Sequence, residues 1–117
     1  MTRMPSYAIG ILNDVRMGLP IVEYLERIDA TLTPFGGAFI VHGSMPTILE
    51  GADPGVIVII EFPDRARAEG WYGSEAYQAI LHLRTGNSSS TIVLVDGVDP
   101  GHVATDVLGA GYKAVRT

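Results

Sequence analysis

The chain contains no cysteine, and this absence excludes several kinds of chemistry at once. It rules out disulfide bonds, thiolate catalysis and metal sites with cysteine ligands. Lysine and arginine are also scarce, with eight residues against thirteen aspartates and glutamates, so the formal net charge is −5. Nucleic acids and anionic membrane surfaces are bound through basic patches. The sequence therefore predicts neither of them as a partner.

Long apolar runs are absent as well. No stretch approaches the roughly 18 apolar residues of a membrane-spanning helix, and no apolar signal-peptide segment follows Met1. The sequence predicts a cytoplasmic protein with no part in the membrane. The histidines His42, His82 and His102 lack the spacing of metal ligands, and no glycine-rich loop suits a phosphate. We expect no metal site and no cofactor.

What the chain has in abundance is apolar residues. They make up 47% of its 117 residues, a length that suits a single domain. Small domains expose much of their surface. A high apolar content in such a domain indicates that part of that surface is buried against a partner.

Glycine and proline divide the chain into strands and helices. In the stretch 31–43, Pro34 cannot continue a helix, and Gly36 and Gly37 permit the turn that follows. We expect strands at about 6–12, 38–43, 56–62 and 90–96, a helix at about 20–33, and a helix in two pieces at about 65–72 and 75–85. Residues 48–50 are a candidate to resume the pairing of the second strand.

The order βαββαβ predicts an α+β fold, a ferredoxin-like sandwich with an antiparallel sheet. The first and third strands would lie in the middle of the sheet and the second and fourth at its edges. We expect residues 1–98 to form this domain and residues 99–117 a C-terminal extension. Val103, Val107 and Leu108 are expected to pack on the main domain or on a partner.

The third and fourth strands do not alternate between apolar and polar residues. Val56 to Ile60 are five successive aliphatic residues, and Ile92 to Val95 are four more. A sheet with one face in water would alternate, so both faces are predicted to be buried. The helices can cover one face, and we expect a second copy of the chain to cover the other. The alternative is that the residues after Gly97 fold back over it.

Several of these segments together resemble a family of proteins, the domain-of-unknown-function family 1330. The resemblance lies in Thr31-Leu32-x-Pro34-Phe35-Gly36-Gly37 with a strand and Gly43 after it, in 49–51, in 61–63, in Trp71-Tyr72-x-Ser74-x-x-Tyr77-Gln78 and in Arg84. It covers about residues 6–98 and implies a homodimeric α/β barrel, in which two ferredoxin-like sheets pack face to face. The family has no established activity. His42 stands where its members usually carry arginine, and residues 99–117 extend beyond their usual end.

His42 and Glu61 are the candidate catalytic residues. In the predicted strand His42 alternates with Ala38 and Ile40, and a histidine titrates near neutral pH, as a general base must. Glu61 follows an aliphatic run, and burial there would raise its pKa, as in catalytic acids. The alternatives are a partly exposed histidine at the end of an edge strand, and a carboxylate at the sheet rim that binds loop amides or an arginine.

Four further residues are candidates for binding a substrate: Trp71, Tyr72, Tyr77 and Arg84. The three aromatic side chains can form a wall for a flat ligand, with a tyrosine hydroxyl as its polar contact. Aromatic residues at this spacing are more often part of a core. Arg84 can offer donors to an anion, and a surface ion pair is the alternative.

We therefore expect a homodimer that binds a small apolar or aromatic molecule between its sheet and its helices, at the strand ends and the helix break. Barrels of this type include cofactor-free oxygenases and isomerases, an analogy of fold alone. The alternative is a non-catalytic dimer that binds a metabolite or another protein. The sequence leaves open whether the protein is an enzyme.

Overall fold

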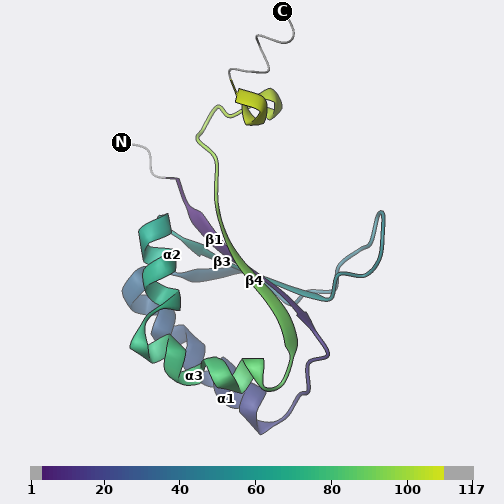
Figure 1. Ribbon diagram of the computed structural model, residues 1–117, viewed down its shortest axis with the longest axis vertical. Coiled ribbons are helices and arrows are strands. Elements are labelled where there is room, and N and C mark those ends of the chain that lie inside the picture. The colour runs from purple at the N-terminus through teal and green to yellow at the C-terminus, as the bar shows by residue number, and fades with distance from the viewer. Residues whose placement is uncertain (1–3, 110–117) are drawn as a thin grey trace, which may run out of the picture.

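The computed structural model describes residues 4–109, and its elements follow the predicted order (Figure 1). They are β1 (Ser6–Asn13), α1 (Leu19–Leu32), β2 (Ala38–His42), β3 (Val56–Phe62), α2 (Arg65–Tyr72), α3 (Glu75–Thr85) and β4 (Ser89–Asp96), with short 3₁₀ turns at Thr33–Phe35 and Ala104–Leu108. In this part of the chain the strands form an antiparallel sheet in the order β2-β3-β1-β4. The predicted ferredoxin-like α+β fold is confirmed, with β1 and β3 in the middle. No helix of residues 4–109 has the length and apolarity needed to cross a membrane.

The turn from α1 into β2 depends on two successive glycines. Gly36 adopts a left-handed conformation with φ 69°, and its amide donates to the carbonyl of Thr33 at 3.2 Å. Gly37 lies against the core, where an added Cβ would be 2.6 Å from the ring of Phe62 and 2.8 Å from the side chain of Leu32. Side chains cannot approach so closely, so the chain needs glycine at position 37 to pass from the helix to the strand.

A capping residue begins each of the helices α2 and α3. The side chain of Asp64 accepts a hydrogen bond from the amide of Arg67 at 2.9 Å, and that of Ser74 accepts one from the amide of Tyr77 at 3.2 Å. Each cap satisfies an amide that has no partner within its own helix. The break brings Trp71, near the end of α2, and Tyr77, near the start of α3, into contact with ring centroids 4.2 Å apart.

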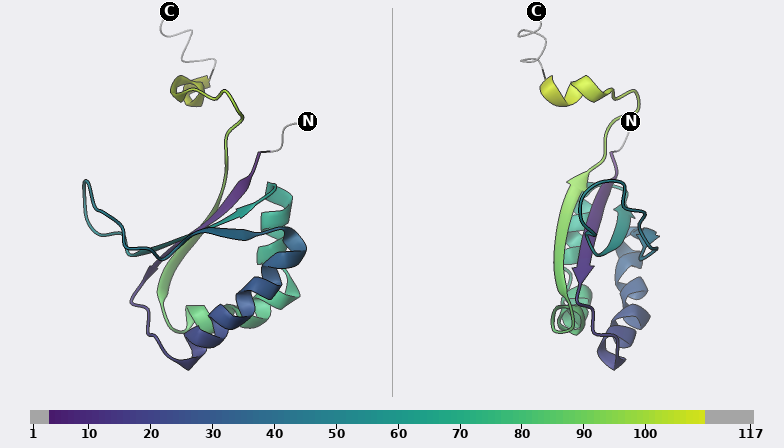
Figure 2. Two further views of the ribbon diagram at one scale, coloured as in Figure 1. Left: turned by 180° about the vertical axis from the view of Figure 1, so that it is seen from behind. Right: turned by 90° about the vertical axis from the view of Figure 1, so that its right-hand side faces the viewer.

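The helices α1, α2 and α3 lie on one face of the sheet (Figure 2). The core between them is centred on Phe62, Trp71 and Tyr77, which are at most 2% exposed. The ring of Trp71 lies 5.4 Å from that of Phe62, and its indole N–H donates to the hydroxyl of Thr31 at 2.9 Å. This bond satisfies a buried donor and ties α2 to α1.

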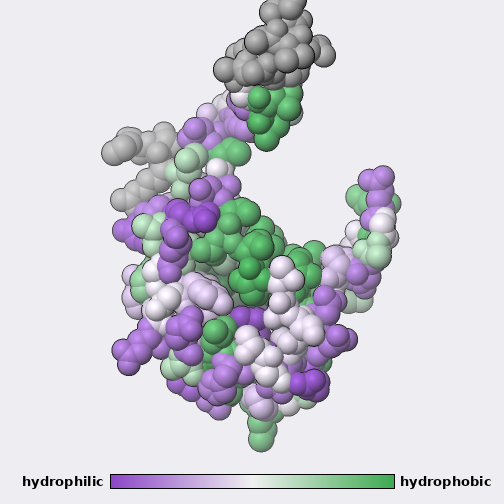
Figure 3. All heavy atoms as spheres, in the orientation of Figure 1, coloured by the Kyte–Doolittle hydropathy of each residue, from purple (hydrophilic) through white to green (hydrophobic). Residues whose placement is uncertain are grey.

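No described element covers the opposite face of the sheet. Ile9, Ile59 and Val93 lie on it together, because directly paired residues of neighbouring strands point to the same side. Val93 and Val95 are 44% and 42% exposed. Figure 3 shows apolar side chains gathered over the strands, between the loop of residues 43–55 and the segment that follows β4. The strands are apolar on both faces, but residues 4–109 cover only one of them.

The expectation that residues 48–50 resume strand pairing is wrong. They belong to a loop, residues 43–55, that projects away from the sheet (Figure 1). Met45 and Leu49 in this loop are 93% and 90% exposed. Left-handed glycines at positions 43, 51 and 55 turn the chain out of the sheet and back into it.

Residues 97–109, the described part of the segment after β4, do not fold back over the sheet. The amide of Gly97 donates to the carbonyl of Pro5 at 2.7 Å, which extends the pairing of β1 with β4 and carries the chain beyond the sheet. Val103, Val107 and Leu108 are 57%, 79% and 52% exposed. They do not pack on the main domain, and their contact with a partner stays a prediction. Residues 110–117 of the predicted extension lie outside the described residues.

The close contact at Gly37 generates a prediction about stability. Gly37→Ala should lower the free energy of unfolding by about 1–3 kcal/mol, because the added methyl group overpacks the core against Phe62. Urea unfolding measures this change. Gly73→Ala is the control, since its added Cβ would meet its nearest atom at an ordinary 3.6 Å. Equal effects of the two substitutions would contradict the role given to Gly37.

Candidate functional site

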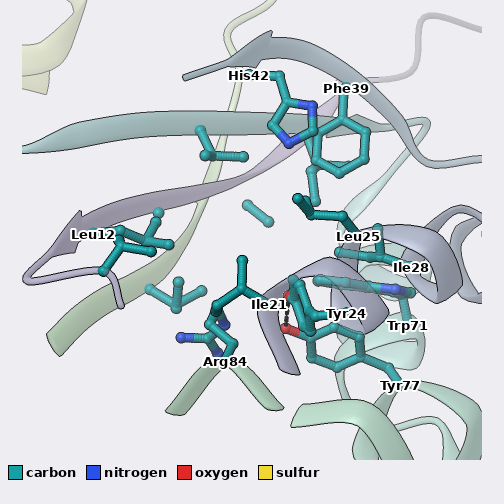
Figure 4. A pocket seen from close by; sticks show the side chains of 16 residues that line it. Leu12, Ile21, Tyr24, Leu25, Ile28, Phe39, His42, Trp71, Tyr77 and Arg84 are labelled. Atoms are coloured by element: carbon teal, nitrogen blue, oxygen red, sulfur yellow. Dashed lines mark hydrogen bonds between the residues drawn. The ribbon is translucent and has the colours of Figure 1, made fainter. Parts of the chain in front are cut away.

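A cavity of about 90 Å³ lies between the sheet and the helices α1 and α3 (Figure 4). Most of its wall is apolar and comes from the inner face of the strands and from α1. The polar side chains in the wall are those of Tyr24, His42, Trp71, Tyr77 and Arg84. The cavity therefore combines an apolar interior with a few polar groups, as small-molecule sites do.

A β-bulge brings His42 to the cavity. The register of β2 against β3 shifts between Phe39 and Val41, so Ile40 is an extra residue in β2. As a result Phe39 and His42 point to the same side, where their rings stack 4.1 Å apart with an interplanar angle of 9°. The regular alternation expected along the strand would place His42 on the same face of the sheet as Ala38. The bulge makes this expectation wrong, because Ala38 lies on the opposite face. His42 remains exposed to solvent at the wall of the cavity.

Tyr24 and Tyr77 are hydrogen-bonded to each other through their hydroxyl groups at 2.6 Å. Burial raises the pKa of Tyr24 well above its usual range, and the neighbouring Tyr77 raises it further, while Arg84 opposes the shift. Tyr24 therefore stays neutral and can donate a hydrogen bond. Tyr24 was not among the predicted site residues, although it lies three residues after Ile21 and four before Ile28, on the apolar stripe of its helix.

Arg84 is buried, with 4% of its surface exposed, and is not the surface ion pair considered as an alternative. One of its terminal nitrogens donates to the hydroxyl of Ser90, whereas its Nε has no hydrogen-bond partner. None of the ion pairs formed within residues 4–109 includes Arg84. Burial lowers the pKa of Arg84, but the hydroxyls of Tyr77 and Tyr24 raise it by more, so the guanidinium stays protonated.

The three predicted aromatic residues take different places. Trp71 and Tyr77 belong to the core and also line the cavity, so the core alternative and the wall hypothesis are compatible for them. Tyr72 packs against them, with its ring 6.1 Å from that of Trp71 and 5.6 Å from that of Tyr77. It does not contribute to the described lining of the cavity.

Glu61 lies on the other face of the sheet. It is paired with Tyr7 and Ala38, on the side away from the helices. Burial raises the pKa of Tyr7, and the Glu61 carboxylate raises it further, so these two groups interact. The structure does not bring Glu61 and His42 together. Within residues 4–109, no group of three or more acidic or histidine side chains is placed to hold a metal ion.

The family model for the domain of unknown function DUF1330 matches residues 5–98. The chain belongs to this family. The resemblance seen in the sequence is thereby confirmed over the whole range predicted for it, about residues 6–98. No curated protein sequence matches this DUF1330 chain.

Solved structures of similar proteins agree with the fold of this DUF1330 protein. The RPA0582 protein of unknown function from Rhodopseudomonas palustris is 14% identical, with a TM-score of 0.64 over 85% of this chain and 86% of the other. A dimeric ferredoxin-like protein of unknown function from Jannaschia sp. CCS1 is 15% identical, with a TM-score of 0.61 over 78% and 97% of the two chains. SnoaB, a cofactor-independent oxygenase from Streptomyces nogalater, is 14% identical, with a TM-score of 0.50 over 84% and 96%. At these identities the similarity establishes the fold alone.

The raised pKa of Tyr24 predicts a loss of stability at alkaline pH. Above the ordinary pKa of 10.0 this tyrosine ionises only in the unfolded chain. Above pH 10 the free energy of unfolding should then fall by about 1.4 kcal/mol per pH unit. Below pH 10 Tyr24 is neutral in both the folded and the unfolded chain, so its contribution to stability is fully present. Urea unfolding from about pH 8 to pH 11 measures the slope. Tyr24→Phe should make the slope shallower, and identical slopes for the two proteins would contradict the assignment.

Proposed function

We propose that the protein is a homodimeric α/β barrel in which each subunit binds a small apolar or aromatic molecule in the cavity between its sheet and its helices. The observation that carries this proposal is the cavity itself, an apolar space in a small domain with polar groups at only a few points of its wall. His42 is exposed where it meets the wall, so a ligand can extend past it toward solvent.

The open sheet face supports the dimer. Exposed valines such as Val93 and Val95 belong to a continuous apolar face, and large exposed apolar patches on small proteins commonly mark interfaces. A second copy packed on this face would leave both cavities on the outer sides of the two sheets. Met45, Leu49 and Val107, which project beyond the sheet, would then have a partner surface to contact. The dimeric neighbour from Jannaschia is consistent with this arrangement.

Light scattering tests the dimer. The wild-type protein should show twice the chain mass of 12.5 kDa. Val95→Glu places a charge on the open sheet face and should yield monomers, because burying an unpaired carboxylate is costly. Val22→Glu is a matched control, since Val22 and Val95 are both 42% exposed but Val22 lies on α1. A monomeric wild type would refute the dimer, and dissociation by the control alone would refute its placement on the open sheet face.

The reaction class that fits this site is that of a cofactor-free oxygenase or isomerase. His42 is the proton-transfer group in this proposal, and Trp71, Tyr77 and Arg84 hold the substrate against it. The fold shared with SnoaB supports the class by analogy only. The second candidate is a non-catalytic dimer that binds a metabolite. It is favoured by the position of Glu61, which lies on the opposite face of the sheet and leaves His42 without the second predicted proton-transfer residue.

Proton transfer by His42 can be measured without knowing the natural substrate. Deuterium uptake from heavy water into small enolisable aryl ketones should be catalysed by the wild-type protein. In His42→Gln the rate should fall by about 10²-fold, because a general base contributes roughly that factor. The melting temperature should not change. His82→Gln, an exposed histidine on α3, is the control. Binding of the ketones without any exchange above background would favour the non-catalytic dimer.

A further inference from the structure

We infer that the natural ligand of the cavity is a small apolar or aromatic carboxylate, and that Arg84 binds its charged group. This inference rests on the proposed function and adds the chemical class of the molecule. It depends on the state of one buried cation and on the donors around it. Neither observation involves His42 or the dimer.

The charge of Arg84 has no counter-charge in the described chain. A guanidinium stays protonated in proteins, and a buried charge without a partner is unfavourable. Arg84 is 4% exposed, and no ion pair within residues 4–109 includes it. The described wall of the cavity contains no aspartate or glutamate. An anionic ligand would supply the missing negative charge at this point.

The donors around Arg84 match a carboxylate. Its Nε carries a hydrogen and has no acceptor, while its bond to Ser90 holds the guanidinium in place. The hydroxyls of Tyr24 and Tyr77 have two hydrogens between them, and their mutual bond uses one. The other hydrogen is free for a ligand. One carboxylate oxygen can accept from Arg84 and the other from a tyrosine, and charge-assisted bonds of this kind are strong.

The cavity also fixes which end of the ligand meets Arg84. Figure 4 shows Arg84 near the two tyrosine hydroxyls on one side of the cavity, and His42 with Phe39 on the other. The indole N–H of Trp71 already donates to Thr31 and is not available. The carboxylate would therefore lie at the Arg84 side, with the apolar part of the molecule directed toward Phe39 and His42.

Arg84 also has a structural explanation. It lies in the last turn of α3, where the helix dipole favours a cation, and it holds Ser90 at the start of β4. This role accounts for a positive charge near the helix end. The hydroxyls of Tyr24 and Tyr77 interact with the guanidinium and account for the position of the side chain in the cavity wall. Neither role accounts for the Nε, which has no hydrogen-bond partner. The experiment must separate the two roles.

Pairs of probes that differ only in charge provide the test. Butyrate suits a cavity of about 90 Å³, and benzoate can extend its ring toward the open side. Each is compared with its neutral amide, butyramide or benzamide, by calorimetric titration at constant ionic strength. The acids should bind at least about 10-fold more tightly than the amides, which corresponds to about 1.4 kcal/mol. Arg84→Gln should abolish this preference, and Arg84→Lys should retain part of it. Arg27→Gln, on the solvent side of α1, should leave it unchanged.

The outcomes distinguish this inference from the proposed function. If the amides bind as tightly as the acids, the inference is wrong, and the cavity still binds small neutral molecules. A preference for acids that persists in Arg84→Gln would place the charge elsewhere and would also refute it. If no probe of either kind binds, both the inference and the proposed function fail. Should Arg84→Gln not fold, the preference measured on the wild-type protein and its reduction in Arg84→Lys decide the question.

Discussion

The packing of Trp71 against Phe62 and Tyr77 holds the helices on the sheet, and the rest of the structure depends on it. Two buried polar contacts extend from this aromatic cluster to α1. The indole of Trp71 donates to Thr31, and the hydroxyl of Tyr77 meets that of Tyr24. These contacts fix α1 relative to both α2 and α3. The cavity lies beside them, so its walls are set by the same residues that stabilise the fold.

The sheet has two apolar faces, and the face on which a residue lies determines what it can do. His42 and Arg84 lie on the helix side and meet the cavity. Glu61 and Tyr7 lie on the open side, where they interact with each other. In the proposed dimer this open side is covered by a second copy of the chain. In the proposed function, proton transfer and ligand binding belong to the helix side, and assembly belongs to the open side.

Local signals explain how much could be predicted from the sequence. Pro34, Gly36 and Ser74 act through the backbone next to them, so the ends of the helices and the break between α2 and α3 were predicted correctly. The position of His42 was not, because the bulge at Ile40 arises from the pairing of β2 with the distant strand β3. The burial of Arg84 depends on the packing of α3 on the sheet, which no short stretch of sequence reports. Tyr24 could have been found from the apolar stripe of its helix.

Isoleucine methyl NMR offers the most direct measurement of whether the cavity binds small molecules. The methyl groups of Ile21, Ile28 and Ile92 line the cavity, whereas Ile57 and Ile59 lie on the opposite face of the sheet. Addition of benzoate, or of benzyl alcohol as a neutral probe, should shift the first set and leave the second set unchanged. Shifts confined to the second set, or no shifts with either probe, would contradict a ligand site between the sheet and the helices.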